Sequence, residues 1–266
     1  MKKRSLSNIY IIFILFIMYL PILLVIIYSF NANRLYSVWS GFSWKWYAQL
    51  FRDQSMFDAL RTSVFLAAIS AVLSAVIGTL GAVGLSRAKL RGAGAMEYLA
   101  TLPIMMPEII LGMVFLAFFS LIHLPFGMIT LIIAHTAFCV PYILLLVKAR
   151  LVGMDKSLVE AARDLGAGEL RAFFDITLPL LMPAVVSGML LSVAMSLDDV
   201  IISVFVTGVD TSLLPLKIYT QIKTGVTPET NALCTLLFLF TIIMGGLSFL
   251  LGNGGLRKKK SFQAAN

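Results

Sequence analysis

The sequence predicts an all-α integral membrane protein with six transmembrane helices. Of its 266 residues, 59% are hydrophobic and only 13% are charged. Its mean hydropathy of +0.95 is far above that of a soluble domain of this length. Apolar runs of about 20 residues, long enough to cross a bilayer as a helix, recur along the chain.

Each of the apolar runs is expected to form one span. They cover residues 9–30, 62–86, 98–122, 126–147, 180–206 and 232–251. The first run is longer than the apolar part of a normal signal peptide and no small-residue cleavage site closes it, so we interpret it as an uncleaved span. The chain is expected to form a single transmembrane domain over residues 1–266, with a long cytoplasmic loop at 148–179.

The distribution of basic residues predicts that both termini are cytoplasmic. In this orientation, 15 of the 21 Lys and Arg residues fall in cytoplasmic segments and six in outer segments. This excess follows the positive-inside rule. The net charge of +8 then reflects topology and headgroup contact, and no basic, aromatic-interleaved patch indicates nucleic-acid binding.

The first outer segment, residues 31–61, contains every tryptophan of the chain. Trp39, Trp44 and Trp46 lie beside Tyr47 and close to the predicted membrane surface. An aromatic girdle at the interface is the ordinary explanation for such a cluster. Stacking of one ring on a cationic substrate is the alternative.

The long cytoplasmic loop contains two short amphipathic helical patterns separated by a glycine turn. Apolar residues spaced for one helix face are Leu158, Ala161, Ala162 and Leu165 in the first pattern, and Leu170, Phe173 and Phe174 in the second. Ser157 and Glu160 fit a capping box at the start of the first helix, and Gly166 and Gly168 are expected to end it. Such a pair of half-helices suits a groove in a partner protein, with a position on lipid headgroups as the alternative.

This loop resembles the EAA loop of ATP-binding-cassette (ABC) importer permeases. The family pattern E-A-A-x3-G-x9-I-x-L-P is matched without a departure. Its residues are Glu160, Ala161, Ala162, Gly166, Ile176, Leu178 and Pro179. The resemblance implies the type I (MetI-like) permease fold and a coupling helix that docks into a cytoplasmic ABC ATPase dimer.

ATP hydrolysis is expected to belong to that partner. The chain has no G-x-x-x-x-G-K-[ST] phosphate loop and contains no Gly-Lys pair. We therefore expect a transport subunit without catalytic residues or cofactors, and with ATP and magnesium bound by the partner ATPase. An intramembrane enzyme is disfavoured because no G-x-S-x-G or H-E-x-x-H motif accompanies the acids.

Three acidic residues, Glu108, Asp198 and Asp199, lie inside predicted spans. No Lys or Arg lies in the second to sixth spans, so these carboxylates have no partner of that kind at similar depth. Because a charge at the centre of a span costs about 2.5–3.5 kcal/mol, the acids indicate a water-filled path, protonation or a bound cation. Glu108 directly follows Pro107, where it could begin a restarted half-helix, a role compatible with substrate contact.

The two adjacent aspartates are predicted to differ in direction. A regular helix would place Asp199 on one stripe with Ser192, Ser196 and Ser203, facing the pore. Asp198 would then flank that stripe or meet a neighbouring subunit. A local break at 197–199 would present both, and structural capping is the alternative role for the pair.

The histidines and cysteines give no sign of a metal site. His123, His135, Cys139 and Cys234 each lack a second ligand at a suitable spacing. We interpret the histidines as packed or hydrogen-bonded residues rather than proton relays, and the cysteines as packing residues. The spaced acids offer too few oxygen ligands for a hydrated divalent ion, so no metal is expected.

Over essentially its whole length the chain is similar to the C-type permease subunits of bacterial spermidine and putrescine importers. The resemblance implies a multi-pass inner-membrane protein with a second homologous permease, a periplasmic polyamine-binding protein and a polyamine substrate. It assigns to the substrate path Trp46, Glu108, Ser196, Asp198 and Asp199, and gives Glu169 a role in transport. Alternatives are another cationic or small solute, or a proton-coupled secondary carrier.

Overall fold

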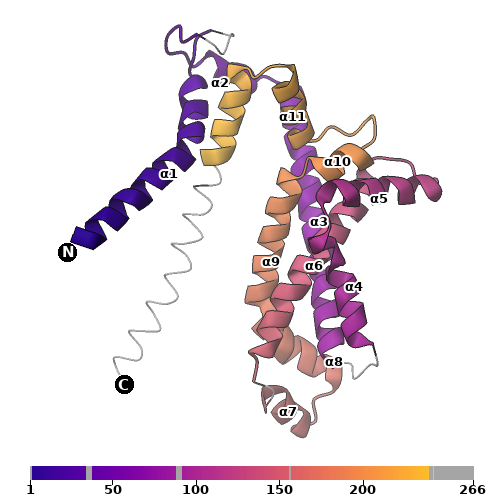
Figure 1. Cartoon of the computed structure of the whole chain (residues 1–266). Helices are drawn as coiled ribbons and strands as arrows, with labels where there is room; N and C mark the ends of the chain where they lie inside the picture. The colour runs from indigo at the N-terminus through magenta and orange to yellow at the C-terminus, as the bar shows by residue number, and fades with distance from the viewer. Residues whose placement is uncertain (1, 34–37, 88–91, 156, 240–241, 243–266) are drawn as a thin grey trace. The chain divides into compact units, whose positions relative to one another are not determined.

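The computed structural model describes residues 2–33, 38–87, 92–155, 157–239 and 242 (Figure 1). Throughout these residues the regular elements are helices. The described residues also contain one isolated antiparallel β-bridge, between Asn31 and Phe42. The chain divides into two compact units. One combines residues up to Met56 with those from Thr220 onward, and the other is Phe57–Tyr219.

The first unit contains an apolar N-terminal helix and a small aromatic core. Its helices are α1 (Lys2–Tyr28), α2 (Lys45–Leu50) and a helical segment over residues 228–239. Trp46 and Tyr47 of α2 are buried against Ala232. The unit thus joins residues from the two ends of the described chain.

The second unit holds most of the structure. Its helices are α3 (Gln54–Arg87, which begins in the first unit), α4 (Ala93–Met105), α5 (Glu108–Leu121), α6 (Met128–Val152), α7 (Ser157–Asp164), α8 (Glu169–Ala172), the π-helical turn η1 (Phe173–Thr177), α9 (Leu178–Asp198), α10 (Ile201–Val206) and α11 (Leu214–Thr224, which ends in the first unit). Helix α6 packs against α4, α9 and α10, and α10 also packs on α5.

Four helices among the described residues are long and apolar enough to cross a membrane. They are Tyr10–Tyr28, Gln54–Ser86, Met128–Val152 and Glu169–Asp198. The pair α4 and α5 adds a fifth if it is counted as one bent span. The predicted run 232–251 is helical where it is described, at 232–239 and 242, so the count of six stays a prediction.

The predicted span 98–122 is not one straight helix, because the chain breaks at Met106 and Pro107. The helices on either side are bent by 111°. Met106 is extended, with φ −85° and ψ 137°, the conformation that a following proline favours. Pro107 has no N–H to continue the helix ladder, so α5 starts afresh at Glu108.

The predicted span 180–206 is also interrupted. Helix α9 ends at Asp198, Asp199 is extended with ψ 120°, and α10 begins at Ile201. The expectation of one continuous helix through residue 206 is therefore wrong, whereas the alternative of a local break is close to what the structure shows.

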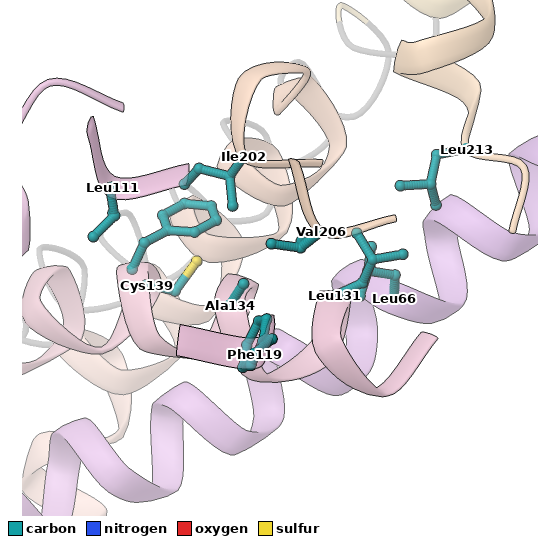
Figure 2. Close-up of a cluster of buried hydrophobic side chains, with 10 residues drawn as sticks. Leu66, Leu111, Phe119, Leu131, Ala134, Cys139, Ile202, Val206 and Leu213 are labelled. Carbon is teal, nitrogen blue, oxygen red and sulfur yellow. The ribbon is translucent and has the colours of Figure 1, made fainter. Parts of the chain in front are cut away.

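A buried apolar cluster packs the two restarted helices against α6 (Figure 2). Leu111 of α5 and Ile202 of α10 meet Cys139 of α6 there, which confirms the packing role predicted for that cysteine. Gly112 allows the close approach, since a Cβ at this position would lie 2.5 Å from Cδ2 of Phe205. Helices α5 and α10 can thus pack closely because residue 112 has no side chain.

Candidate functional site

The loop at 148–179 forms the helical pair that the sequence predicts. Helix α7 begins at Ser157, whose backbone N–H donates to Oδ1 of Asp155 at 3.0 Å. This hydrogen bond holds the pKa of the exposed Asp155 carboxyl below its ordinary value, because it stabilises the charged form. The side chain that accepts the Ser157 N–H is therefore that of Asp155, in place of Glu160 as the predicted capping box required.

Gly166 ends α7 in a left-handed conformation, with φ +85°. The N–H of Gly166 donates to Arg163 O, and the N–H of Ala167 donates to Ala162 O, both at 2.9 Å. These two hydrogen bonds make a Schellman motif, which favours glycine at this position because a side chain strains the left-handed region. The glycine of the EAA pattern thus fixes the turn that follows Glu160, Ala161 and Ala162.

The second half of the loop leads directly into a transmembrane helix. Helix α8 is followed by the π-helical turn η1, which contains Ile176, and then by α9, whose first residues are Leu178 and Pro179. Proline is tolerated in the first turn of a helix because the missing N–H leaves no necessary bond unmade. The I-x-L-P part of the pattern therefore marks the junction between the loop and α9.

The loop presents apolar side chains that the described chain leaves uncovered. Leu165 is 90% exposed and Leu170 is 76% exposed, and Leu158 and Phe174 are also exposed. Glu169 forms an ion pair with Arg163 at 2.8 Å, which links α8 to α7. Since both side chains of this pair are well exposed, its contribution to stability is small. We name Leu158, Leu165, Leu170 and Phe174 the coupling surface.

Both predicted positions of intramembrane acids lie at helix breaks. Glu108 is the first residue of α5 and is exposed, which confirms the predicted restart after Pro107. Its carboxylate lies at the positive end of the α5 dipole. Asp198 is the last residue of α9 and is also exposed. Broken helices of this kind form the substrate sites of many transporters.

Asp199 has different surroundings from Asp198, because it is buried and hydrogen-bonded within the chain. Its Oδ1 accepts from Ile202 N at 3.1 Å. Its Oδ2 accepts from Ser203 N at 2.8 Å and from the Ser203 hydroxyl at 2.7 Å. The carboxylate therefore caps the first turn of α10, as the capping alternative predicts.

His135 is the neighbour that the sequence reasoning did not connect with the acids. It is fully buried in α6, with Nε2 3.4 Å from Oδ2 of Asp199. Its Nδ1 lies 2.8 Å from the Ser196 hydroxyl and its Nε2 lies 3.1 Å from the Ser203 hydroxyl. The hydrogen-bonded role predicted for this histidine is confirmed. No sequence signal pairs positions that lie 61 and 68 residues apart.

The predicted serine stripe is divided between α9 and α10, and Ser196 and Ser203 both contact His135 of α6. The members of the stripe are all buried: Ser192, Ser196, Asp199 and Ser203. The argument that placed Asp199 toward the pore assumed a regular helix, and the break at Asp199 removes that assumption. In the structure Asp198 is the exposed member of the pair. The assignment of Ser196, Asp198 and Asp199 to a substrate path stays a prediction.

Trp46 lies in the first unit and is only 3% exposed. Its indole N–H donates to Asn31 O at 2.6 Å, and the Lys45 ammonium lies 5.1 Å from the ring centroid. Trp39 and Trp44 are the exposed tryptophans of the cluster. A substrate role for Trp46 stays a prediction, whereas its packing with Tyr47 gives it a structural role in this chain.

The helical spans, the helix breaks with exposed acids and the apolar loop surface together describe a multi-pass membrane transport subunit. Residues 74–256 match the family model of binding-protein-dependent transport system inner membrane components. The chain belongs to this family.

Proteins from two bacteria are similar to this chain over most of its length. The spermidine/putrescine transport system permease protein PotC of Haemophilus influenzae is 40% identical over 251 residues, which are 94% of this chain and 98% of that protein. The putrescine transport system permease protein PotI of Escherichia coli K12 is 41% identical over 238 residues, covering 87% and 85%.

Solved structures show the same fold at low identity. A chain of a bacterial ABC transporter involved in the import of the acidic polysaccharide alginate matches with a TM-score of 0.73 and 16% identity, over 93% of this chain and 95% of that one. A chain of the MetNI methionine ABC transporter in inward-facing form matches with a TM-score of 0.54 and 21% identity, over 81% and 98%. These likenesses confirm the predicted ABC permease fold.

Proposed function

We propose that this chain is a permease subunit of an ABC importer for polyamines. The observation that carries the proposal is the 40% identity, over nearly the whole of both chains, to a spermidine/putrescine permease. The exposed carboxylates of Glu108 and Asp198 support a cationic substrate, because they supply negative charge at two helix breaks inside predicted spans. The protein itself performs no chemistry and is not an enzyme.

The proposed assembly contains three further components. A second homologous permease completes the pore, and a periplasmic polyamine-binding protein delivers the substrate on the outer side. A cytoplasmic ABC ATPase dimer binds ATP and magnesium and docks on the coupling surface, whose exposed leucines and phenylalanine suit an apolar groove. The complex lies in a bacterial inner membrane, with both termini of this chain in the cytoplasm.

Transport requires that the ATPase bind differently to the two states of the pore. A partner shifts a conformational equilibrium only by its differential affinity for those states. Leu170 and Phe174 of the coupling surface lie on α8 and η1, which continue into α9 without a gap. Closure of the ATPase would therefore displace α9. The acids at the breaks would lower the free energy of the polycation as it passes through the membrane.

Reconstitution of the complete importer tests this function. Vesicles should contain both permeases, the ATPase and internal ATP, with the binding protein and radiolabelled spermidine outside. We expect spermidine uptake that stops when the phosphate-loop lysine of the ATPase is replaced, because that matched variant keeps the assembly but not hydrolysis. Uptake by this chain alone, driven by a pH gradient, would instead establish a proton-coupled carrier.

Competition by unlabelled solutes tests the substrate class in the same vesicles. Unlabelled putrescine and spermidine should compete with the label, whereas a neutral sugar should not, because the exposed acids attract only the cations. Equal competition by unrelated monovalent cations would point to a general cation permease and contradict the polyamine assignment.

A further inference from the structure

The Asp199 carboxylate is buried and accepts three hydrogen bonds from its own chain. Both carboxylate oxygens accept from the first turn of α10, through the N–H groups of Ile202 and Ser203 and the Ser203 hydroxyl. The side chain is 5% exposed. A substrate amine that replaced these donors would displace the cap of α10 and leave buried N–H groups without an acceptor. The geometry thus gives Asp199 a structural task.

His135 connects both sides of the break to a third helix. Its Nδ1 meets Ser196 of α9, and its Nε2 meets Ser203 of α10 and the Asp199 carboxylate. The network is satisfied when Nε2 carries the proton and Nδ1 accepts from the Ser196 hydroxyl, an assignment made from the pattern of partners. One buried imidazole on α6 therefore ties together the last turn of α9, the extended residue and the first turn of α10.

The direction of Asp198 depends on this arrangement. On a continuous helix, adjacent side chains point about 100° apart, and the chain would continue along the α9 axis. The extended backbone of Asp199 instead ends α9 immediately after Asp198, which is left exposed. Any change in the break would move the Asp198 carboxylate relative to α6 and α9.

We propose that His135 is a positioning residue for transport, which holds Ser196, Asp199 and Ser203 across the α9–α10 break and thereby fixes where Asp198 meets the substrate. The proposal rests on the proposed polyamine transport and adds a division of roles between the two aspartates. Asp198 supplies the negative charge for the substrate, whereas Asp199 and His135 determine where the Asp198 carboxylate lies.

The first test measures the break itself in the complete importer. His135→Leu has an apolar side chain and therefore removes the hydrogen bonds to Ser196 and Ser203. His135→Gln keeps a polar side chain that can form one of these two hydrogen bonds. Thr136→Val is the matched control, because Thr136 is buried on the same helix and its hydroxyl has no hydrogen-bond partner in the structure. Hydrogen–deuterium exchange of a peptide covering residues 199–206 should be at least about tenfold faster in His135→Leu than in the control. The reason is that the Asp199 carboxylate, which accepts from the first amides of α10, is no longer held in place by His135.

The second test measures spermidine transported per ATP hydrolysed. We expect this ratio to fall about tenfold in His135→Leu and to fall less in His135→Gln. Adding Asp199→Asn to His135→Leu should cause a smaller loss than the product of the two single losses, because the two residues share one contact across the break. Adding Glu108→Gln should multiply the loss, because Glu108 lies at the other break.

The outcomes separate this inference from the proposed function. If the unmodified importer moves no spermidine, the proposed function fails, and the exchange experiment still decides whether His135 holds the break. If the unmodified importer is active but His135→Leu matches Thr136→Val in both measurements, the inference is overturned. If His135→Leu does not assemble, Ser196→Ala and Ser203→Ala replace it, and normal exchange and transport in both would equally overturn it.

Discussion

At the scale of single residues, two adjacent aspartates differ because of their hydrogen-bond partners. Asp199 accepts two N–H groups and one hydroxyl, and hydrogen bonds to a charged acceptor each contribute about 1.5–3 kcal/mol. Asp198 is exposed. The Asp199 carboxylate therefore stabilises the fold, whereas the Asp198 carboxylate is accessible to a ligand.

This difference predicts separate effects of the two amide substitutions. Asp199→Asn should lower the thermal unfolding temperature of the purified importer, because the amide offers one acceptor oxygen in place of two and loses the charge, at a cost of about 1–3 kcal/mol. Asp198→Asn should leave unfolding unchanged and reduce spermidine uptake. Differential scanning fluorimetry and uptake assays measure the two effects, and an equal loss of stability in both variants would contradict the division.

Gly112 gives a second prediction for a single residue. Gly112→Ala places a Cβ 2.5 Å from the Phe205 ring, so the α5–α10 contact must shift, and overpacking of this kind typically costs about 1–3 kcal/mol. Gly84→Ala is the matched control, because a Cβ there meets nothing within 4 Å. The thermal unfolding temperature should fall for Gly112→Ala alone, and Phe205→Leu should partly restore it. No difference between the two glycine variants would exclude the close approach.

At the scale of helices and turns, the coupling loop was the most predictable part of the chain. The apolar spacing, the acidic start and the glycine stop are local signals, and helix α7 with its Schellman end follows them. The break at Met106–Pro107 was also accessible, because proline acts on its own neighbours. Local chemistry sufficed wherever the interacting residues were neighbours in sequence.

The break after Asp198 was harder to predict because its cause is not local. Neither glycine nor proline occurs in the stretch from Ser196 to Val206, and the apolar run reads as one span. The extended conformation of Asp199 is supported by His135, 64 positions earlier on another helix. Hydropathy reports how apolar a segment is, but it does not report which buried side chain will meet it.

Gly166 yields a prediction for the coupling loop. Gly166→Val should weaken binding of the ATPase, because a β-branched residue at φ +85° costs at least about 1–2 kcal/mol and disturbs the end of α7. Gly166→Asn should be tolerated better, since asparagine visits this region more readily. Gly168→Ala is the control, because Gly168 has an ordinary φ of −66° and open space around a Cβ. Co-purification of the ATPase with the tagged permease measures the effect, and equal recovery with Val and Ala would contradict it.

At the scale of the whole molecule, composition indicated the membrane class and the charge distribution predicted a topology. The long apolar helices agree with the class, and four or five of them are found among the described residues. The family match and the fold of the solved relatives agree with the EAA pattern. What composition cannot supply is the partner of each exposed apolar face, because the contacts of a permease in its complex lie on other chains.

The predicted topology can be tested by thiol labelling in cells. In a background of Cys139→Ala and Cys234→Ala, Leu165→Cys should react only with a reagent that enters the cytoplasm, because the basic residues of the loop at 148–179 predict that it lies there. Trp39→Cys should react with an impermeant reagent added outside. Both positions are exposed, so access rather than burial decides the result. Labelling of both from the same side would overturn the orientation.

Helix α9 also has a mechanical consequence. It begins with the last residues of the EAA pattern and is helical as far as Asp198, with Pro183 inside it, so its 21 residues span about 30 Å. A helix transmits a displacement of one end to its other end more completely than a loop of the same number of residues does. A tilt of α9 at its loop end, where the proposed ATPase would dock, would therefore appear at the other end as a sideways displacement of the Asp198 carboxylate, and the length of the helix would set the size of that displacement.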